Sequence, residues 1–114
     1  MLRIGVIEIQ VRNFRESVKF YTKKLGLKVF AIEPDDKFAM FDTGEAKLSL
    51  WETKNPEKSN KTKIYFPVTD IHKTVKRLTK KDVKFTSKIE KRHWGYRISF
   101  VDSEQNEHFL YQET

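Results

Sequence analysis

The chain has 114 residues, of which 38% are hydrophobic, and it contains no cysteine. Its 23 basic and 16 acidic side chains give a formal net charge of +7. The length fits one compact domain or two halves too small to bury separate cores, and we favour two modules that share a core. The lack of cysteine excludes disulfides, thiol catalysis and thiolate metal sites.

The distribution of apolar and charged residues limits the partners. No run approaches the roughly 20 apolar residues that span a bilayer, and the first residues lack the apolar core of a signal peptide. The basic residues are scattered among the acidic ones and recur on the polar faces of two predicted helices, which is typical of solvated surface. We therefore expect a cytoplasmic protein that does not bind membranes, with nucleic-acid binding only as an alternative.

The first half is predicted to contain a strand, a helix and three further strands. Alternating apolar residues indicate a strand over residues 1–10. Asn13 then caps a helix, with Glu16 placed to complete a capping box, and Gly26 ends it. The helix carries one apolar stripe. Its members are Phe14, Val18, Tyr21 and Leu25. Three strands separated by turns follow, over residues 27–32, 37–42 and 46–52.

The second half repeats this order after a polar segment, residues 53–62, that has the composition of an exposed linker. Asp70 is predicted to cap the second helix, over residues 71–81. Asn106 can tolerate a left-handed conformation in the tight turn of residues 102–106. The predicted strands cover residues 63–68, residues near 83–89, 96–101 and 107–111.

The two halves also match residue by residue. Val11 corresponds to Val68, and this spacing of 57 residues holds as far as residues 79–81. The second half then lacks one residue, so Leu27 corresponds to Val83 at a spacing of 56 residues. Such a long spacing, kept through different elements, is typical of a duplicated unit. We predict an α+β fold with two tandem β-α-β-β-β modules, residues 1–52 and 63–114, forming one domain over residues 1–114.

Two segments of the sequence resemble the vicinal oxygen chelate superfamily, which includes glyoxalase I, bleomycin-resistance proteins and extradiol dioxygenases. VRNFRESVKFYTKKLGLKV, residues 11–29, is similar to the opening pattern of the family. WGYRISFVDSEQNEHFLYQ, residues 94–112, is similar to its closing pattern. The resemblance implies that each module curls into a half-barrel with its helix outside and a ligand inside. It does not specify the function, because the scaffold carries many chemistries.

The resemblance also implies four positions that hold a divalent metal in the family's enzymes, usually as His, Glu or Gln. In this sequence those positions fall on Val6, Ser49, Lys63 and Phe109. A register slip could rescue one of these positions but not all four. Glu8 shares a face with Val6, whereas the step from Phe109 to His108 turns the side chain to the opposite face of the strand. We therefore expect no bound metal and no other cofactor.

If the strands alternate as predicted, one face collects aromatic rings and a few polar groups. That composition suits a flat organic ligand, while filling of the barrel core by the same rings is the alternative. The face comprises Val6, Glu8, Gln10, Lys47, Ser49, Trp51, Lys63, Tyr65, Phe109 and Tyr111. Trp51 and Trp94 are expected to meet a ligand or an interface. Arg97 is expected to form a local ion pair, with ligand contact as the alternative.

Glu8 is the candidate catalytic residue. A carboxylate inside a half-barrel is expected to pair with Lys47 or Lys63, and the alternatives are a general base or an anchor for a cation.

Three functions remain open from the sequence. We expect a metal-free, bleomycin-resistance-like homodimer that sequesters an aromatic or amphipathic small molecule, with a cavity lined by both subunits. The net charge favours a neutral or anionic ligand over a cationic drug. One alternative is a glyoxalase-like lyase or isomerase with Glu8 as base. The other is a basic interaction module that binds nucleic acid or protein.

Overall fold

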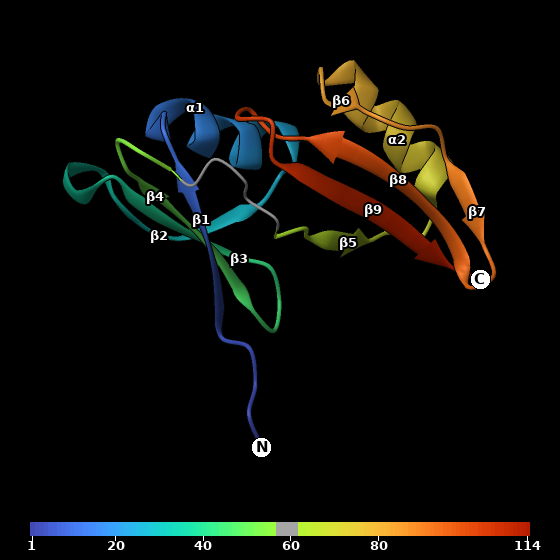
Figure 1. Ribbon diagram of the computed structural model, residues 1–114, viewed down its shortest axis with the longest axis horizontal. Coiled ribbons are helices and arrows are strands. Elements are labelled where there is room, and N and C mark those ends of the chain that lie inside the picture. Colours follow the sequence, from blue (N-terminus) through green and yellow to red (C-terminus); the bar gives the residue numbers. More distant parts are fainter. Residues whose placement is uncertain (57–61) are drawn as a thin grey trace. The chain divides into compact units, whose positions relative to one another are not determined.

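The computed structural model describes residues 1–56 and 62–114. The chain divides into two compact units, residues 1–60 and 61–114, and each contains a β-sheet with helical structure on one face (Figure 1). The boundary falls inside the segment predicted as a linker, of which residues 57–61 lie outside the described residues. This arrangement of sheets and helices confirms the predicted α+β class.

The first unit contains a four-stranded sheet in the order β1-β4-β3-β2. β1 (Val6–Val11) runs parallel to β4 (Lys47–Glu52). β3 (Phe38–Asp42) is antiparallel to β4 and to β2 (Lys28–Glu33). A short 3-10 turn, η2 (Pro34–Asp36), joins β2 to β3. With one helical segment after β1, the predicted order of the first module is confirmed.

The first helix is less regular than the α-helix that the apolar stripe predicts. α1 (Phe14–Lys19) continues as a π-helical segment, η1 (Phe20–Lys24). The Asn13 side chain caps α1 by accepting a hydrogen bond from the Glu16 backbone N–H at 3.1 Å. Because a π-helical turn holds more residues than an α-helical turn, the buried face shifts. The buried residues are Ser17, Phe20 and Tyr21, whereas Phe14, Val18 and Leu25 are only half-buried.

The core of the first unit lies between this helix and the sheet. Tyr21 is fully buried and stacks on Phe41 of β3, with ring centroids 5.9 Å apart. The other buried sheet residues alternate along β1, β3 and β4, as expected for one covered face. They are Ile9, Val11, Ala39, Leu48 and Leu50.

The second unit repeats this topology with the strand order β5-β9-β8-β6. β5 (Tyr65–Pro67) is parallel to β9 (Glu107–Glu113), and β8 (Gly95–Val101) is antiparallel to β9. β6 (Lys84–Phe85) pairs with the other edge of β8. The helix of this unit, α2 (Ile71–Lys80), packs against β9. The two units therefore share one β-α-β-β-β plan, to which the second adds a short strand.

That added strand results from a break in the strand predicted near residues 83–89. β6 ends at Phe85, and β7 (Glu90–Arg92) pairs separately with β8. Between them Ser87 Oγ accepts a hydrogen bond from the Ser99 N–H at 3.1 Å, and Thr86 Oγ1 lies 2.7 Å from Ser99 Oγ. Side-chain hydroxyls that bond to a neighbouring backbone compete with regular strand pairing in this way.

A buried carboxylate organises the last turn. Asp102 is only 3% exposed and accepts hydrogen bonds from the backbone N–H groups of Glu104 and Asn106, at 2.8 and 2.9 Å. The Asn106 side chain donates to the other oxygen of Asp102 at 2.9 Å. Asp102 thus binds both the backbone and the side chain of Asn106, and the left-handed residue of this turn is Gln105, with φ 67°, rather than Asn106.

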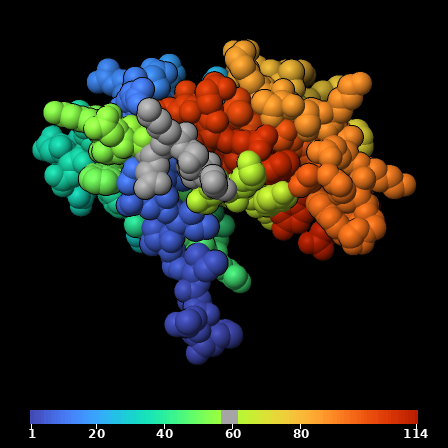
Figure 2. All heavy atoms as spheres, viewed as in Figure 1, coloured from blue at the N-terminus to red at the C-terminus, as the bar shows by residue number. Residues whose placement is uncertain are grey.

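The amino-terminal residues do not join the first sheet as predicted. β1 begins at Val6, and the Gly5 carbonyl still accepts a hydrogen bond from the Lys47 N–H of β4 at 2.8 Å. The residues before Gly5 extend away from the rest of the first unit (Figure 2). Met1, Leu2 and Ile4 are strongly exposed. Among the helices of the described residues, none is long and apolar enough to cross a membrane.

Candidate functional site

Each sheet has one face covered by its helix and an opposite face, which we call the open face. In the first unit the register places Val6, Glu8 and Gln10 of β1 directly beside residues of β4. Those partners are Lys47, Ser49 and Trp51. Because the intervening residues Ile9 and Leu50 are buried against the helix, these six residues occupy the open face. The site residues predicted in the first module therefore share one face of the sheet, although Ser49 is only 1% exposed there.

A cavity of about 520 Å³ opens on this face. Trp51 is 42% exposed, so its ring can be reached by a ligand. The cavity lining is acidic and aromatic, and it consists of Glu8, Glu33, Asp36, Phe38 and Trp51. Glu33, Asp36 and Phe38 were not predicted as site residues. Strand pairing is the signal for two of them, because Phe38 pairs with Trp51 and Glu33 pairs with Phe38. No sequence signal places Asp36 of η2 there.

Glu8 does not form the ion pair that was expected for it. Lys47 Nζ instead lies 3.9 Å from Asp42, and Lys63 Nζ lies 2.6 Å from Glu107. Within the described part of the first unit the Glu8 carboxylate has no ion pair or hydrogen bond. Its negative charge therefore faces the cavity without compensation from the predicted lysines.

The open face of the second unit is dominated by aromatic rings. The Tyr65 ring stacks on Phe109, with centroids 4.5 Å apart and planes 10° from parallel. Phe109 is 6% exposed and Tyr65 is 40% exposed. Phe109 thus fills space beneath Tyr65, while Tyr65 remains accessible. A second cavity, of about 450 Å³, is lined by Tyr65, Trp94, Tyr111 and Glu113.

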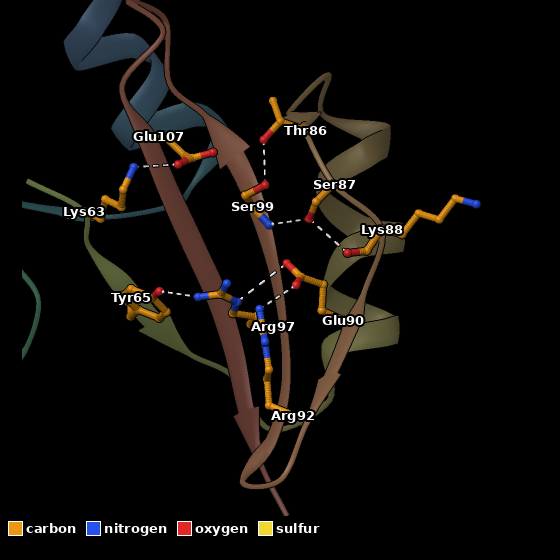
Figure 3. Close-up of polar contacts among 10 residues, drawn as sticks. All are labelled: Lys63, Tyr65, Thr86, Ser87, Lys88, Glu90, Arg92, Arg97, Ser99 and Glu107. Carbon is orange, nitrogen blue, oxygen red and sulfur yellow. Dashed lines mark hydrogen bonds and ion pairs between the residues drawn. The ribbon is translucent and has the colours of Figure 1, made fainter. Parts of the chain in front are cut away.

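Arg97 is held on this face by its neighbours (Figure 3). Its Nη1 donates a hydrogen bond to the Tyr65 hydroxyl at 2.7 Å, and its Nε lies 3.6 Å from a carboxylate oxygen of Glu90. The guanidinium also lies over the Phe109 ring, 4.8 Å from the ring centroid. The local ion pair predicted for Arg97 is therefore confirmed, and the side chain orients Tyr65. Lys63, in its ion pair with Glu107, is the remaining site residue predicted in this module (Figure 3).

Comparison with known proteins identifies the family. Residues 3–109 match the sequence profile of the Glyoxalase/Bleomycin resistance protein/Dioxygenase superfamily. The chain belongs to this superfamily. The uncharacterized protein YraH of Bacillus subtilis (strain 168) is 31% identical over 120 residues, which cover 92% of this chain and 94% of YraH. The family resemblance read from the opening and closing motifs is thus confirmed.

Solved structures of the superfamily share the fold at low sequence identity. TnmS3, an antibiotic binding protein from Streptomyces sp. CB03234, superposes with a TM-score of 0.83 at 17% identity, covering 100% of this chain and 98% of that one. Lactoylglutathione lyase from Agrobacterium tumefaciens gives a TM-score of 0.75 at 13% identity, covering 96% and 92%. A binding protein and an enzyme therefore share this fold with the chain, so the fold alone does not specify the function.

The side chains at the four expected metal positions do not fit a superfamily metal centre. Val6 and Phe109 have no donor atom, and Lys63 is a cation. Ser49 lies directly across from Glu8, which adds a single carboxylate. Throughout residues 1–56 and 62–114, no group of three or more His, Cys, Asp or Glu side chains is placed to hold a metal ion.

His108, which adjoins Phe109 in sequence, lies on the helix-covered side of its sheet. It is fully buried, and its Nδ1 accepts a hydrogen bond from the Ile64 N–H at 3.3 Å. Its Nε2 lies 3.9 Å from the buried Asp102 carboxylate. Burial, partly opposed by Asp102, lowers the pKa of His108. A neutral, enclosed imidazole on the far side of the strand is a structural residue rather than a ligand on the open face.

Proposed function

We propose that this protein is a metal-free member of the superfamily that binds an aromatic or amphipathic small molecule on its open faces. One observation carries the proposal: each unit has an open cavity lined by accessible aromatic rings. Trp51 supplies the ring in the first unit, and Tyr65 and Trp94 supply rings in the second. Large aromatic surfaces beside a few polar groups are typical of sites that bind organic ligands.

The charge lining the first cavity refines the class of ligand. The protein carries +7 overall, but Glu8, Glu33 and Asp36 make the wall of this cavity negative. Charges further away than about 8 Å are largely screened at physiological ionic strength, so the nearby carboxylates dominate. We therefore include neutral and cationic aromatic molecules in the proposed ligand class, and we place anionic ones last.

Sequestration requires affinity and no reacting group, which agrees with a site that has rings and lacks a metal donor set. The antibiotic binding protein TnmS3, which shares this fold, supports the same type of function. Its low identity to this chain means that the ligand itself does not carry over.

The proposal includes a homodimer. Strand β2 lies at the edge of the first sheet and exposes Val29, Phe30 and Ile32, by 40%, 60% and 43%. Apolar side chains gathered on an edge strand are a common feature of surfaces that pair with a second subunit. Light scattering should give twice the monomer mass of 13.6 kDa, and replacing Phe30 by Lys should shift the protein toward that monomer mass.

A fluorescent aromatic probe tests the binding function. We expect N-phenyl-1-naphthylamine, which is neutral and flat, to bind the purified protein with enhanced emission. Trp51→Ala should weaken binding by about tenfold or more, because loss of a stacked ring costs roughly 1–3 kcal/mol, whereas Trp51→Phe should keep most of the affinity. Lys80→Ala, at an exposed position of α2 in the second unit, is the matched control. Equal binding by the Trp51→Ala and Lys80→Ala proteins would contradict the proposal.

A glyoxalase-like lyase or isomerase is the second candidate, and Glu8 is the residue that favours it. Its carboxylate lines the cavity and makes no ion pair or hydrogen bond within the described first unit, so it could accept a proton from a bound substrate. An assay for lactoylglutathione formation, with and without added divalent metal, separates the two functions. Turnover that is lost in Glu8→Gln would establish the enzyme and overturn the sequestration function.

A further inference from the structure

The open cavity of the second unit is lined by rings that stand at steep angles to one another. The Trp94 and Tyr111 rings have centroids 6.1 Å apart and planes at 77°. The Tyr65 and Tyr111 rings have centroids 6.0 Å apart and planes at 64°. A flat ligand can stack on one such ring but not on three at once. A compact, rounded group, in contrast, can touch several of them together.

Contacts within the second unit fix the backbone at Trp94 and the hydroxyl of Tyr65 before any ligand arrives. The Trp94 carbonyl accepts a hydrogen bond from the Thr114 N–H at 3.1 Å. The next residue, Gly95, lies across from Glu113, so β8 and β9 approach closely beside the cavity. Arg97 holds the Tyr65 hydroxyl at 2.7 Å. Preorganised walls of this kind reduce the entropy cost of binding.

A carboxylate at the cavity can serve as counter-charge to a bound cation. It belongs to Glu113, whose side chain makes no ion pair or hydrogen bond with the described residues of the second unit. The nearby cations Arg97 and Arg92 are both paired with Glu90, at 3.6 and 2.8 Å, so they are partly neutralised. Ring faces are themselves negative, and they attract cations within about 6 Å of the ring centroid.

We propose that this cavity binds the alkylated ammonium group of a small molecule, such as a trimethylammonium group, among Tyr65, Trp94 and Tyr111, with Glu113 as counter-charge. The inference rests on the proposed binding function and names the chemical group that the second unit recognises. A trimethylammonium group matches the site because its methyl groups contact rings from several directions while its charge is delocalised and weakly hydrated. A primary ammonium would lose strong hydration without gaining enough hydrogen bonds.

Choline and its neutral isostere 3,3-dimethyl-1-butanol test this inference on the full chain, because they share a shape and differ in charge. Titrations are followed by calorimetry and by the indole N–H resonance of Trp94 in NMR spectra, assigned with Trp94→Phe. We expect choline to bind about tenfold more tightly than the alcohol and to shift the Trp94 resonance. Equal affinities, or no shift of Trp94 at saturating choline, would overturn the proposal.

Matched variants separate the effects of ring, charge and folding. Tyr111→Leu keeps apolar bulk but removes the ring face, and it should weaken choline binding by about tenfold, whereas Tyr111→Phe should change it by less than about threefold. Glu113→Gln, at an exposed position, should weaken choline binding by about threefold and leave the alcohol unchanged. If choline binding in Glu113→Gln and Tyr111→Leu matches the wild type, the proposal fails.

The two proposals fail in different ways in this experiment. N-phenyl-1-naphthylamine, titrated into the same samples, reports on the broader binding function through Trp51. Dye binding without a preference for choline over the alcohol would overturn the alkylammonium site alone. Absence of dye binding in the wild type would overturn the proposed function of the first cavity while the choline result still decides the second.

Discussion

The Tyr65 ring lies almost flat on the Phe109 ring, with centroids 4.5 Å apart and planes 10° from parallel. Strand alternation places both side chains on the same face of the second sheet, so the sequence alone does not show which of them contacts a ligand and which fills the core. The structure separates them, because Phe109 is buried and Tyr65 is accessible. One ring is therefore part of the packed core, and the other forms the surface that a ligand can reach.

This division predicts different costs for the two residues. Phe109→Ala should reduce the free energy of unfolding by about 3–5 kcal/mol, because it leaves a cavity under Tyr65. Tyr65→Ala should cost about 1–2 kcal/mol, since its ring is already partly solvated. Urea denaturation followed by circular dichroism measures both. A Tyr65→Ala protein that is destabilised as much as Phe109→Ala would contradict this assignment.

Metal content gives a second prediction. With Val6, Ser49, Lys63 and Phe109 at the expected ligand positions, we expect less than about 0.1 equivalent of zinc, nickel, cobalt, manganese or iron in protein purified without chelator. EDTA should leave the thermal midpoint unchanged, because no metal-binding energy contributes to folding. Stoichiometric metal that survives gel filtration would contradict this expectation and revive the enzymatic alternative.

The buried His108 predicts how stability depends on pH. Burial, the largest effect, lowers the pKa of His108 below 6.5. Well above pH 6.5 the imidazole is neutral in both the folded and the unfolded chain. As the pH falls below that value, the unfolded chain binds the proton first, so the free energy of unfolding decreases until the pH reaches the pKa of the folded state. The urea midpoint, measured from about pH 8 to pH 5, should fall over this acidic range.

His108→Asn is the control for this pH dependence. The asparagine oxygen can replace Nδ1 as the acceptor for the Ile64 N–H, but the side chain does not titrate. The variant should therefore have a flatter stability profile below about pH 6.5. An unchanged slope in His108→Asn would assign the acid sensitivity to carboxylates elsewhere.

Gly95 gives a prediction about backbone geometry. Its φ of 150° disfavours other residues, and an added Cβ would overlap the carbonyl oxygen of Gln112 on β9. Gly44 also has a positive φ, of 104°, but a Cβ there meets nothing within 4 Å. Gly95→Ala should therefore reduce the free energy of unfolding by about 3 kcal/mol more than Gly44→Ala, which should cost about 1–3 kcal/mol. Similar denaturation midpoints for the two variants would show that β8 and β9 can separate without cost.

The sequence predicts the fold well because its local signals agree. Asn13 and Asp70 cap the two helices through hydrogen bonds of 3.1 and 3.0 Å, at the positions where the repeat places them. Alternation along β1 and β9 also places Glu8 and Tyr111 on the open faces. These features depend on neighbouring residues in the chain, and single-sequence reasoning can reach them.

Features that depend on contacts between segments distant in the chain cannot be predicted from a single sequence. The break after Phe85 follows from hydroxyl bonds to Ser99, fourteen residues further along the chain. Asp36 reaches the first cavity only because η2 folds beside it. Lys47 pairs with Asp42 rather than Glu8, because which of two nearby carboxylates a lysine meets depends on side-chain geometry.

The π-helical segment explains how the duplicated halves can differ in length. Between its helix and the following strand, the first repeat has one residue more than the second. In η1 the Leu25 N–H bonds to the Phe20 carbonyl at 3.1 Å, and the Leu27 N–H bonds to the Tyr21 carbonyl at 2.9 Å. These wide turns take up the surplus residue, and both copies keep the same strand order. Chain-length variation between the halves, whether by insertion or deletion, therefore has a tolerant location at residues 20–27, away from the open face of the first unit.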